Sequence, residues 1–312
     1  MNQKTITSPG IYSLAADVYH SDPCPTPSLS GSVAIPLVHR SPRHAWWAHP
    51  RLNAATERHE SSRMDLGTVA HELLLGVGGG IEVIDADSFT TKAAREARDA
   101  AREAGKTPVL TAAYEQAKAM SERAREFLDH AVIGWTDGKP EQTMFWQEGD
   151  AWCRGMVDWL KNDLRTVIDY KTTGTSARPD DVERHLFDMN YHLKAAFYER
   201  GLNVLDPANI GRREFLFLFQ ETDAPFECSL VTLSEGAMTI GRKQATYAIR
   251  RWQSCMRSGV WQGYGLDWKT ASPPPWIEQR WLAREMSDPF ATGETEPGET
   301  MPVYPVNGNA GF

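Results

Sequence analysis

Apolar and polar residues alternate along the middle of the chain, with the period of two that is typical of half-buried β-strands. Three consecutive segments show this alternation: EQTMFWQE (141–148), AWCRGMVDWL (151–160) and TVIDYKTT (166–173). Turn residues separate them, namely 149–150 and 161–163. Because short connections join neighbouring strands, we expect the second and third segments to pair antiparallel in one sheet. Two further strands are predicted at REFLFLFQE (213–221) and FECSLVTLS (226–234).

Helical periodicity dominates the segments on either side of these strands. Before the strands, helices are predicted from Leu29, after Pro42, and over 64–76, 92–106 and 110–131. Later in the chain, one long helix is predicted over 181–201 and a last helix over 235–259. This order of elements predicts an α/β fold, in which helices flank a mixed central β-sheet and a helical segment precedes it.

The chain is expected to form one domain over residues 1–286. Its mainly helical part would be 1–135, and the sheet core with its helices would be 136–260. Residues 287–312 are rich in Pro and Gly, carry several acidic residues and contain no Lys or Arg. Such a composition buries too little apolar surface to fold, so this segment is predicted to be a disordered acidic tail.

Composition narrows the class of protein. The 312 residues are 41% hydrophobic and 24% charged, an ordinary globular balance. The formal net charge of -8 counts against a broadly basic nucleic-acid binder, although it allows a local basic groove. No apolar run reaches the roughly 18 residues of a membrane span. The N-terminal MNQKTITSPGIYSL lacks the apolar core of a secretory signal, so we expect a soluble intracellular protein.

Neither a cysteine-bound metal site nor an ATP site is expected. The four cysteines are too widely spaced for C-x-x-C pairs, which argues against a zinc ribbon or an iron–sulfur cluster and favours buried thiols: Cys24, Cys153, Cys228 and Cys255. The GVGGG segment (76–80) lacks the Lys-Ser/Thr that follows a phosphate-binding loop. We therefore interpret it as a flexible turn, with no ATP site.

Charged residues interrupt two of the predicted strands. Asp169 and Lys171 are two residues apart and therefore share one face of a strand. They could form an exposed ion pair of little energetic weight. In the preceding strand, however, Asp158 lies between two apolar neighbours, where a carboxylate is costly unless it is paired or binds a metal. Antiparallel pairing would bring Asp158 close to Asp169.

Two neighbouring carboxylates repel each other unless a cation lies between them, and hard divalent ions prefer oxygen ligands. The carbonyl of Tyr170 could add a third oxygen, and Lys171 would lie beside the metal, where it could polarise a water or offset transition-state charge. His71 is either a core histidine or a nitrogen ligand of the same metal. Gly67 and Thr68 precede it by about one turn and permit close packing against the sheet.

Two other segments combine aromatic and basic residues. Tyr191, Lys194 and Tyr198 fall on one face of the predicted helix after the TVIDYKTT strand, where they could hold a DNA backbone or form an ordinary amphipathic face. Arg40 and Arg43 accompany two tryptophans near the N-terminus, as in contacts with single strands or DNA ends. We expect this segment to line a DNA entrance.

Five motifs, in this order, resemble the PDDEXK nuclease superfamily: GTVAHELLLG, EQTMFWQ, CRGMVDWL, IDYKTT and YHLKAAFY. More narrowly, they resemble the RecE-type (exonuclease VIII-like) enzymes of phages and prophages. The N-terminal SLSGS and SPRHAWW are similar to the opening helices of that branch. The resemblance extends over residues 28–259, and its specificity lies in the order of the motifs rather than in any one of them.

The resemblance implies a role for each residue of the motifs. The expected metal ligands are His71, Asp158, Asp169 and the carbonyl of Tyr170, and the expected catalytic lysine is Lys171. Glu141 matches an acidic position with a supporting role. The family usually has glutamine four residues before the tyrosine of its helix, whereas this chain has Lys194 before Tyr198. A lysine can hold a phosphate but cannot accept a hydrogen bond, so the glutamine's role is open.

The resemblance further implies a Mg²⁺-dependent 5′-to-3′ exonuclease, with Mn²⁺ able to substitute. Its substrate would be the ends of linear double-stranded DNA, and its product a 3′ single-stranded overhang for phage recombination by strand annealing. A ring-shaped homo-oligomer, a tetramer ahead of a trimer, is implied, with a single-strand annealing protein as partner and the cytoplasm of a bacterial host as location. An endonuclease of repair or restriction type and a non-catalytic DNA-binding recombination scaffold are the alternatives.

Overall fold

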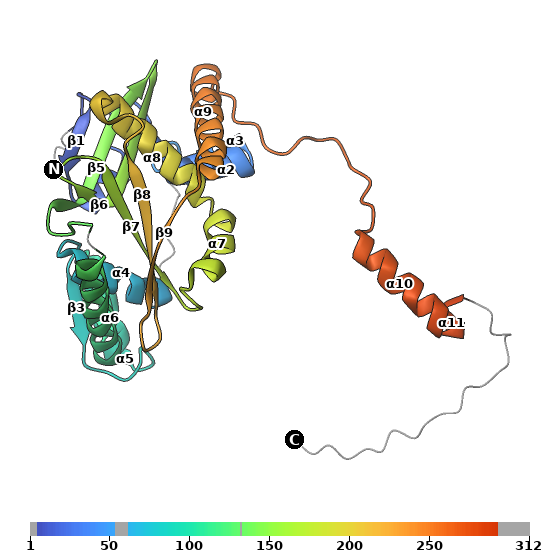
Figure 1. Cartoon of the computed structure of the whole chain (residues 1–312), viewed down its shortest axis with the longest axis horizontal. Coiled ribbons are helices and arrows are strands. Elements are labelled where there is room, and N and C mark those ends of the chain that lie inside the picture. Colours follow the sequence, from blue (N-terminus) through green and yellow to red (C-terminus); the bar gives the residue numbers. More distant parts are fainter. Residues whose placement is uncertain (1–4, 54–61, 132, 293–312) are drawn as a thin grey trace, which may run out of the picture. The chain divides into compact units, whose positions relative to one another are not determined.

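The computed structural model describes residues 5–53, 62–131 and 133–292. The chain divides into two compact units, Met1–Tyr264 and Gly265–Phe312, so the division comes earlier than the expected boundary at 286. The second unit contains α10 (Pro275–Ser287) and α11 (Pro289–Thr292), and the expected tail therefore begins in a short helix (Figure 1). The rest of that tail, 293–312, lies outside the described residues.

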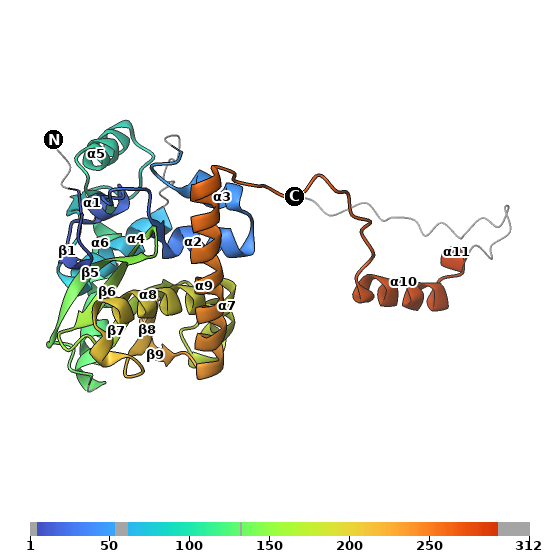
Figure 2. The same cartoon turned by 90° about the horizontal axis from the view of Figure 1, so that it is seen from above.

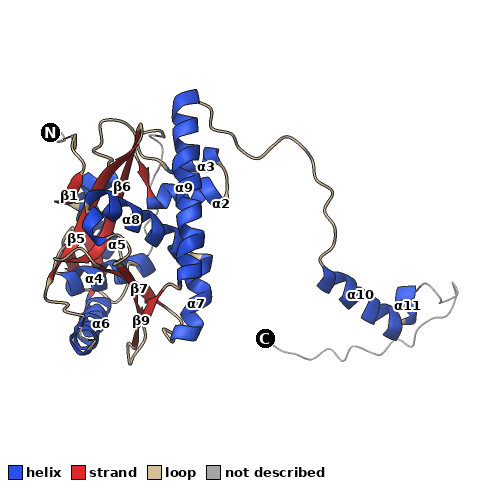
Figure 3. Cartoon of the chain, turned by 45° about the horizontal axis from the view of Figure 1, so that its top comes forward, coloured by secondary structure: helices blue, strands red, loops and turns tan. Residues whose placement is uncertain are grey.

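A mixed β-sheet forms the centre of the first unit (Figures 1 and 3). Its strands run in the order β1 (Gly10–Ser13), β5 (Gly138–Glu148), β6 (Ala151–Lys161), β7 (Thr166–Thr173), β8 (Glu214–Glu221) and β9 (Cys228–Thr232), with β2 (Leu29–Ser30) also pairing β6. Within the described part of this sheet, β7–β8 and β2–β6 are parallel pairs and the other pairs are antiparallel. The five predicted strands and the mixed sheet are confirmed. The strands β1 and β2 were missed because they are too short to show alternation.

Each face of the sheet has its own apolar core. On one face, α8 (Tyr191–Leu205) packs between the sheet and α9 (Glu235–Ser258), together with α2 (Gly31–His39) and α3 (Pro42–Ala48) (Figure 2). On the other face lie α4 (Ser62–Leu75) and α6 (Thr111–His130). Along β7, Val167 enters the first core, whereas Ile168 and Tyr170 enter the second. The predicted alternation of faces along this strand is thus confirmed.

The remaining elements are peripheral. They are α1 (Ala16–His20), β3 (Ile81–Ile84), α5 (Lys92–Glu103), β4 (Thr107–Leu110), α7 (Pro179–Asp188) and a 3₁₀ turn at Pro207–Asn209. The strands β3 and β4 form a separate parallel pair and were not predicted. Among the helices that the structure describes, none is both long enough and apolar enough to span a membrane.

The single helix predicted over 181–201 is wrong, because it is interrupted between α7 and α8. Met189 directly follows α7 as its C-cap residue and is 47% exposed. Asn190 follows with a left-handed backbone (φ +57°), a conformation that asparagine tolerates better than most residues, and α8 begins at Tyr191. The interruption lets α8 start in a new direction, with its first turn beside β7.

A buried polar cluster fixes the N-terminal segment to β6. The carboxylate of Asp22 accepts hydrogen bonds from the backbone amide (2.9 Å) and hydroxyl (2.6 Å) of Ser28. It also lies 3.3 Å from His49 Nε2 and 3.2 Å from Arg154 Nη1. Burial alone raises the pKa of the Asp22 carboxyl, but the hydrogen bonds from His49 and Ser28 and the charge of Arg154 hold it below its usual value.

Candidate active site

Three acidic residues, here called the carboxylate row, lie level with one another on adjacent strands: Glu141 on β5, Asp158 on β6 and Asp169 on β7. The β5–β6 pairing continues on both sides of Glu141 and Asp158 but omits these two residues. The β6–β7 pairing stops one residue before Asp158 would meet Asp169. Glu141 also has a left-handed backbone, with φ of +43°. The hydrogen-bonded pairing of the strands is therefore interrupted at the carboxylate row. A non-glycine residue with a left-handed backbone, such as Glu141, is common at functional sites.

Asp158 replaces the missing contact between β6 and β7 with its side chain. Its Oδ2 accepts a hydrogen bond of 2.7 Å from the backbone amide of Tyr170. Its Oδ1 lies 3.4 Å from Nε2 of His71 on α4. Burial raises the pKa of Asp158, but the charges of Lys171 and His71 outweigh burial and hold the pKa far below its usual value. Asp158 is therefore ionised throughout the physiological range of pH.

Oxygen atoms surround the ammonium of Lys171. Its Nζ lies 2.6 Å from Asp169 Oδ2 and 3.7 Å from Asp158 Oδ2. It also donates a hydrogen bond of 3.0 Å to the carbonyl of Tyr170. Burial lowers the pKa of Lys171, but the two carboxylates outweigh it and the pKa is raised, so the side chain remains an ammonium. The structure thus brings Asp158, Asp169, Lys171 and the Tyr170 carbonyl to one point.

Asp169 has a second ammonium, which comes from α8. Its side chain is 0% exposed, and its Oδ1 accepts a hydrogen bond of 3.3 Å from Lys194 Nζ. The pKa of Lys194 is raised, because the attraction of Asp169 and Asp158 outweighs the effect of burial. A fully buried carboxylate is costly without such partners. Lys194 therefore balances the charge of Asp169. It occupies the position where the RecE-type enzymes that the motifs resemble usually have glutamine.

His71 lies between two members of the carboxylate row, Glu141 and Asp158. Its Nδ1 lies 3.9 Å from Glu141 Oε1, on the opposite side of the ring from Asp158. Burial lowers the pKa of His71, but Asp158 and Glu141 outweigh it and the pKa is raised. The pKa of Glu141 is also raised, chiefly by burial, with His71 opposing the shift and the charge of Asp158 adding to it. His71 and Glu141 therefore bind a proton more readily than Asp158 does.

Close packing of α4 on β7 places His71 at the row. A Cβ atom at Gly67 would lie 2.9 Å from the hydroxyl of Thr172, closer than real Cβ contacts come. The ring of His71 stacks on Tyr170, with centroids 6.3 Å apart. Gly67 therefore permits the close approach that the sequence predicted.

The chemistry of these donors fits a hard divalent ion. Two carboxylates and a backbone carbonyl face one cationic centre, and Mg²⁺ typically takes one or two carboxylates and keeps several waters. Asp169 Oδ2 is buried and accepts no hydrogen bond, so its contact with Lys171 is an ion pair alone. However, no three His, Cys, Asp or Glu side chains in the described part of the chain are grouped as metal ligands. His71 touches Asp158 but not Asp169, so the three predicted side-chain ligands are adjacent without sharing one centre.

A family described as "PDDEXK-like domain of unknown function (DUF3799)" matches residues 43–265, which is more than half of the chain. The chain belongs to this family. The match confirms the expected PDDEXK-like fold and shows no narrower branch within that superfamily. A comparison with the curated proteins finds no match.

The chain is also similar to solved structures. A protein of Eubacterium rectale that is provisionally named an exonuclease gives a TM-score of 0.57 at 12% identity, over 86% of this chain and 98% of that chain. A phage-related exonuclease from Haemophilus somnus 129PT gives a TM-score of 0.32 at 9% identity, over 75% of this chain and 96% of that chain. Only the first similarity is high enough to support an argument, and it shows the fold alone.

The DNA-contacting face predicted on the helix of this PDDEXK-like domain is only partly accessible. Tyr191 is half-buried and stacks on Phe217, with ring centroids 5.6 Å apart, while Lys171 Nζ lies 5.5 Å from its ring. Tyr198 is 4% exposed, because Gly31 and Gly155 let α2 and β6 close over its ring. The predicted DNA contact of Tyr198 is therefore wrong: this side chain packs in the core.

Arg40 and Arg43 lie apart from the carboxylate row. Both are exposed, at the end of α2 and within α3, in the corner that packs on α9 (Figure 2). The backbone amide of Arg43 donates to the carbonyl of Gln262 after α9. A role at a DNA entrance remains a prediction for these two residues.

Gln220 is a supporting residue that the sequence analysis missed. Its side-chain oxygen accepts a short hydrogen bond from the Tyr170 hydroxyl, and its Nε2 donates to the carbonyl of Met120 at 2.9 Å. Gln220 thereby fixes the residue whose carbonyl faces Lys171. The available signal was a lone amide at the end of the apolar FLFLFQE strand, because a buried amide requires partners.

Proposed function

We propose that this protein is a divalent-metal-dependent nuclease that hydrolyses DNA phosphodiester bonds, acting as an exonuclease on the ends of linear duplexes. One observation carries the proposal: Asp158, Asp169 and the Tyr170 carbonyl converge on the ammonium of Lys171 at an opening in the sheet. This combination of oxygen donors and a lysine suits metal-assisted attack of water on a phosphate.

In this proposal Asp158, Asp169 and the Tyr170 carbonyl hold a Mg²⁺ ion, which Mn²⁺ can replace, with His71 as a nitrogen ligand beside Asp158. The bound ion would supply Lewis-acid stabilisation of the phosphate and lower the pKa of a water. Lys171 remains protonated, so it orients the attacking water and offsets the negative charge that grows on the phosphate. Glu141 supports the site by holding the imidazole of His71.

Lys194 has a separate role in this scheme. It remains protonated beside Asp169 and directs that carboxylate, whereas the glutamine expected here could both donate and accept. Lys194 therefore acts as a positioning residue through Asp169. Tyr191, at the start of the same helix, is half-buried and would contact the substrate strand through the part of its side chain that is accessible.

The finer functional assignments rest on the resemblance of the motifs. They are 5′-to-3′ polarity, a 3′ overhang for phage recombination, a ring-shaped homo-oligomer, a single-strand annealing protein as partner and a bacterial cytoplasm as location. End-dependence has the further support that the similar E. rectale protein is provisionally named an exonuclease.

Linear duplexes labelled separately at the 5′ and the 3′ ends test enzyme, metal and polarity together. We expect nucleotide release from linear DNA with Mg²⁺, none with EDTA, and loss of the 5′ label first. A covalently closed circle should remain intact. Cutting of the circle would indicate an endonuclease, and an absence of nucleotide release with either ion would indicate a scaffold. The Asp169→Asn variant controls for a contaminating nuclease.

A further inference from the structure

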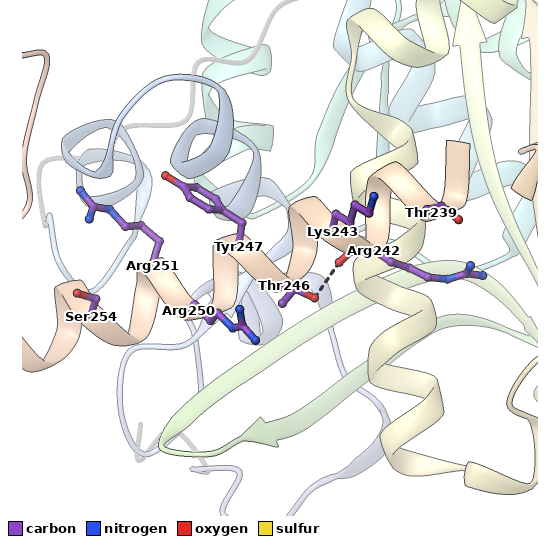
Figure 4. Close-up of a pocket in the computed structure, with 8 residues that line it drawn as sticks. All are labelled: Thr239, Arg242, Lys243, Thr246, Tyr247, Arg250, Arg251 and Ser254. Carbon is purple, nitrogen blue, oxygen red and sulfur yellow. Dashed lines mark hydrogen bonds between the residues drawn. The ribbon is translucent and has the colours of Figure 1, made fainter. Parts of the chain in front are cut away.

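An open hollow of about 650 Å³ lies along one face of α9, away from the carboxylate row (Figure 4). Six of the side chains that line it, here called the α9 face, follow one another at helical spacing: Lys243, Thr246, Tyr247, Arg250, Arg251 and Ser254. Residues three or four apart lie on the same side of a helix. The α9 face is therefore one continuous row, and Lys243 and Arg251 stand about 12 Å apart along its axis.

The cations of the α9 face have no acidic partner in the part of the chain that the structure describes. Elsewhere on the helix, Arg242 pairs with Glu199 and Arg257 pairs with Asp150. By contrast, no carboxylate within the described residues lies at ion-pair distance from the charged members of the α9 face: Lys243, Arg250 and Arg251. The helix has five basic residues and one acidic residue, in a chain of net charge -8. Such segregation produces a local positive potential that attracts polyanions.

An exposed aromatic ring lies among these cations. Tyr247 is 53% exposed, four residues from both Lys243 and Arg251, and its ring stacks on no other ring among the described residues. In Figure 4 its side chain projects to the same side of α9 as that of Arg251. Rows of cations with an aromatic ring between them bind single strands, because the cations follow the phosphates while a base stacks on the ring.

The row continues beyond α9. Gln262, which follows the helix, accepts hydrogen bonds from Arg251 Nη2 through its side chain and from the Arg43 amide through its carbonyl. Arg43 is exposed on α3, so a further cation lies next to the end of the α9 face. A narrow row of this kind suits one flexible phosphate chain better than a duplex, whose base faces are hidden from Tyr247.

We propose that the α9 face, extended by Arg43, binds single-stranded DNA without sequence preference, at a site separate from the carboxylate row. Lys243, Arg250 and Arg251 contact phosphates, Tyr247 stacks on a base, and Ser254 donates a hydrogen bond. The inference rests on the proposed function in one respect: the nuclease would produce the single strand by digesting its complement.

Fluorescence anisotropy of a labelled oligothymidylate, with the full-length protein in EDTA, tests this site without cleavage. The triple substitution Lys243→Gln, Arg250→Gln and Arg251→Gln should weaken binding at least about tenfold and lower the salt slope by about two, since each phosphate contact contributes roughly 0.7 for single strands. Tyr247→Ala should weaken binding about tenfold at an unchanged salt slope, and Tyr247→Phe should bind like wild type.

The matched control removes the same charge from the exposed helix α5, by Lys92→Gln, Arg95→Gln and Arg98→Gln. This control should bind the oligonucleotide like wild type. Equal losses in both triple variants, or wild-type affinity in the α9 variant, would overturn the proposal. Tighter binding of a duplex, or of polyglutamate, than of oligothymidylate would overturn it in favour of those ligands.

Hydrolysis of linear duplex by the wild type, measured in parallel with Mg²⁺, separates this proposal from the proposed function. An inactive wild type with α9-dependent binding would contradict the nuclease assignment and leave the single-strand site in place. An active wild type whose binding ignores the α9 substitutions would contradict the site alone.

Discussion

Each member of the carboxylate row lies at ion-pair distance from a basic side chain, whereas three cations of the α9 face have no carboxylate partner among the described residues. The first set is largely buried and the second is largely exposed. Buried charges must be balanced within the fold, because desolvation is costly. Exposed charges need no internal partner and remain available to a ligand. Substitutions should therefore affect stability and chemistry at the row, but ligand affinity alone at the α9 face.

The largest effect is expected from Asp169→Asn. Hydrolysis of linear duplex should fall by about three orders of magnitude, because a proposed metal ligand is lost. The free energy of unfolding should fall by about 3 kcal/mol, since two buried ammoniums lose their shared counter-ion. Quenched-flow hydrolysis and urea unfolding measure the two losses. Full activity in this variant would remove the row from the mechanism.

Lys171→Met separates catalysis from metal binding. Hydrolysis should fall about 10²-fold to 10³-fold, because the charge beside the phosphate is lost. Mg²⁺ affinity, measured by calorimetry, should be retained or increased, since the ammonium no longer competes for the oxygens of Asp169 and Tyr170. Lys171→Arg, which keeps the charge, is the control for affinity. A metal affinity that fell together with activity would contradict the role of Lys171.

Asp22→Asn tests whether a buried, paired carboxylate matters for folding without any part in the chemistry. We expect a loss of about 3 kcal/mol in the free energy of unfolding at neutral pH, because Arg154 loses its buried partner. The folded-state pKa of Asp22 is lowered, so its contribution is present above the unfolded pKa of about 3.8 and is lost as pH falls through the folded pKa.

Urea unfolding from about pH 3 to about pH 7 measures this contribution. The wild type should lose stability more steeply than Asp22→Asn toward the acidic end. Parallel acid limbs for the two proteins would show that Asp22 does not titrate as proposed. Hydrolysis per folded molecule should be equal in both.

The smallest effect is expected from Lys243→Gln on the α9 face. The free energy of unfolding should change by less than about 0.5 kcal/mol, because an exposed cation without a partner contributes little to stability. Thermal unfolding at matched ionic strength measures the change. A loss near that of Asp22→Asn would mean that Lys243 serves the fold, and the contrast between the two regions would fail.

Local pattern was sufficient to predict the sheet core and the placement of Asp158 and Asp169 at the same level of adjacent strands. Strand alternation and short turns determine register over a few residues, so these two carboxylates were expected to be neighbours. The interruption at Asn190 was not predicted, because the apolar spacing continues across it and one left-handed residue leaves no periodic signal. The ion pair between Lys194 and Asp169 depends on that interruption.

The sequence also could not predict which individual side chains are buried. Tyr198 occupies a helical face that suits a ligand, yet two distant glycines bring α2 and β6 against its ring. Likewise, the sequence of α9 predicts a charged amphipathic helix but not which cations find partners, because Glu199 and Asp150 come from other elements. Such outcomes depend on tertiary contacts.

The left-handed residue between α7 and α8 also limits which sequences the site tolerates. The carbonyl of Asn190 accepts a hydrogen bond of 3.2 Å from the backbone amide of Lys194, and the torsion angles of Asn190 determine where α8 begins and hence where Lys194 points. In a saturation library at this position, Gly and Asp should survive alongside Asn, and β-branched residues should be eliminated, because few side chains accept positive φ. Selection for activity would thus act on this position through its backbone torsion angles rather than through a side chain in the carboxylate row.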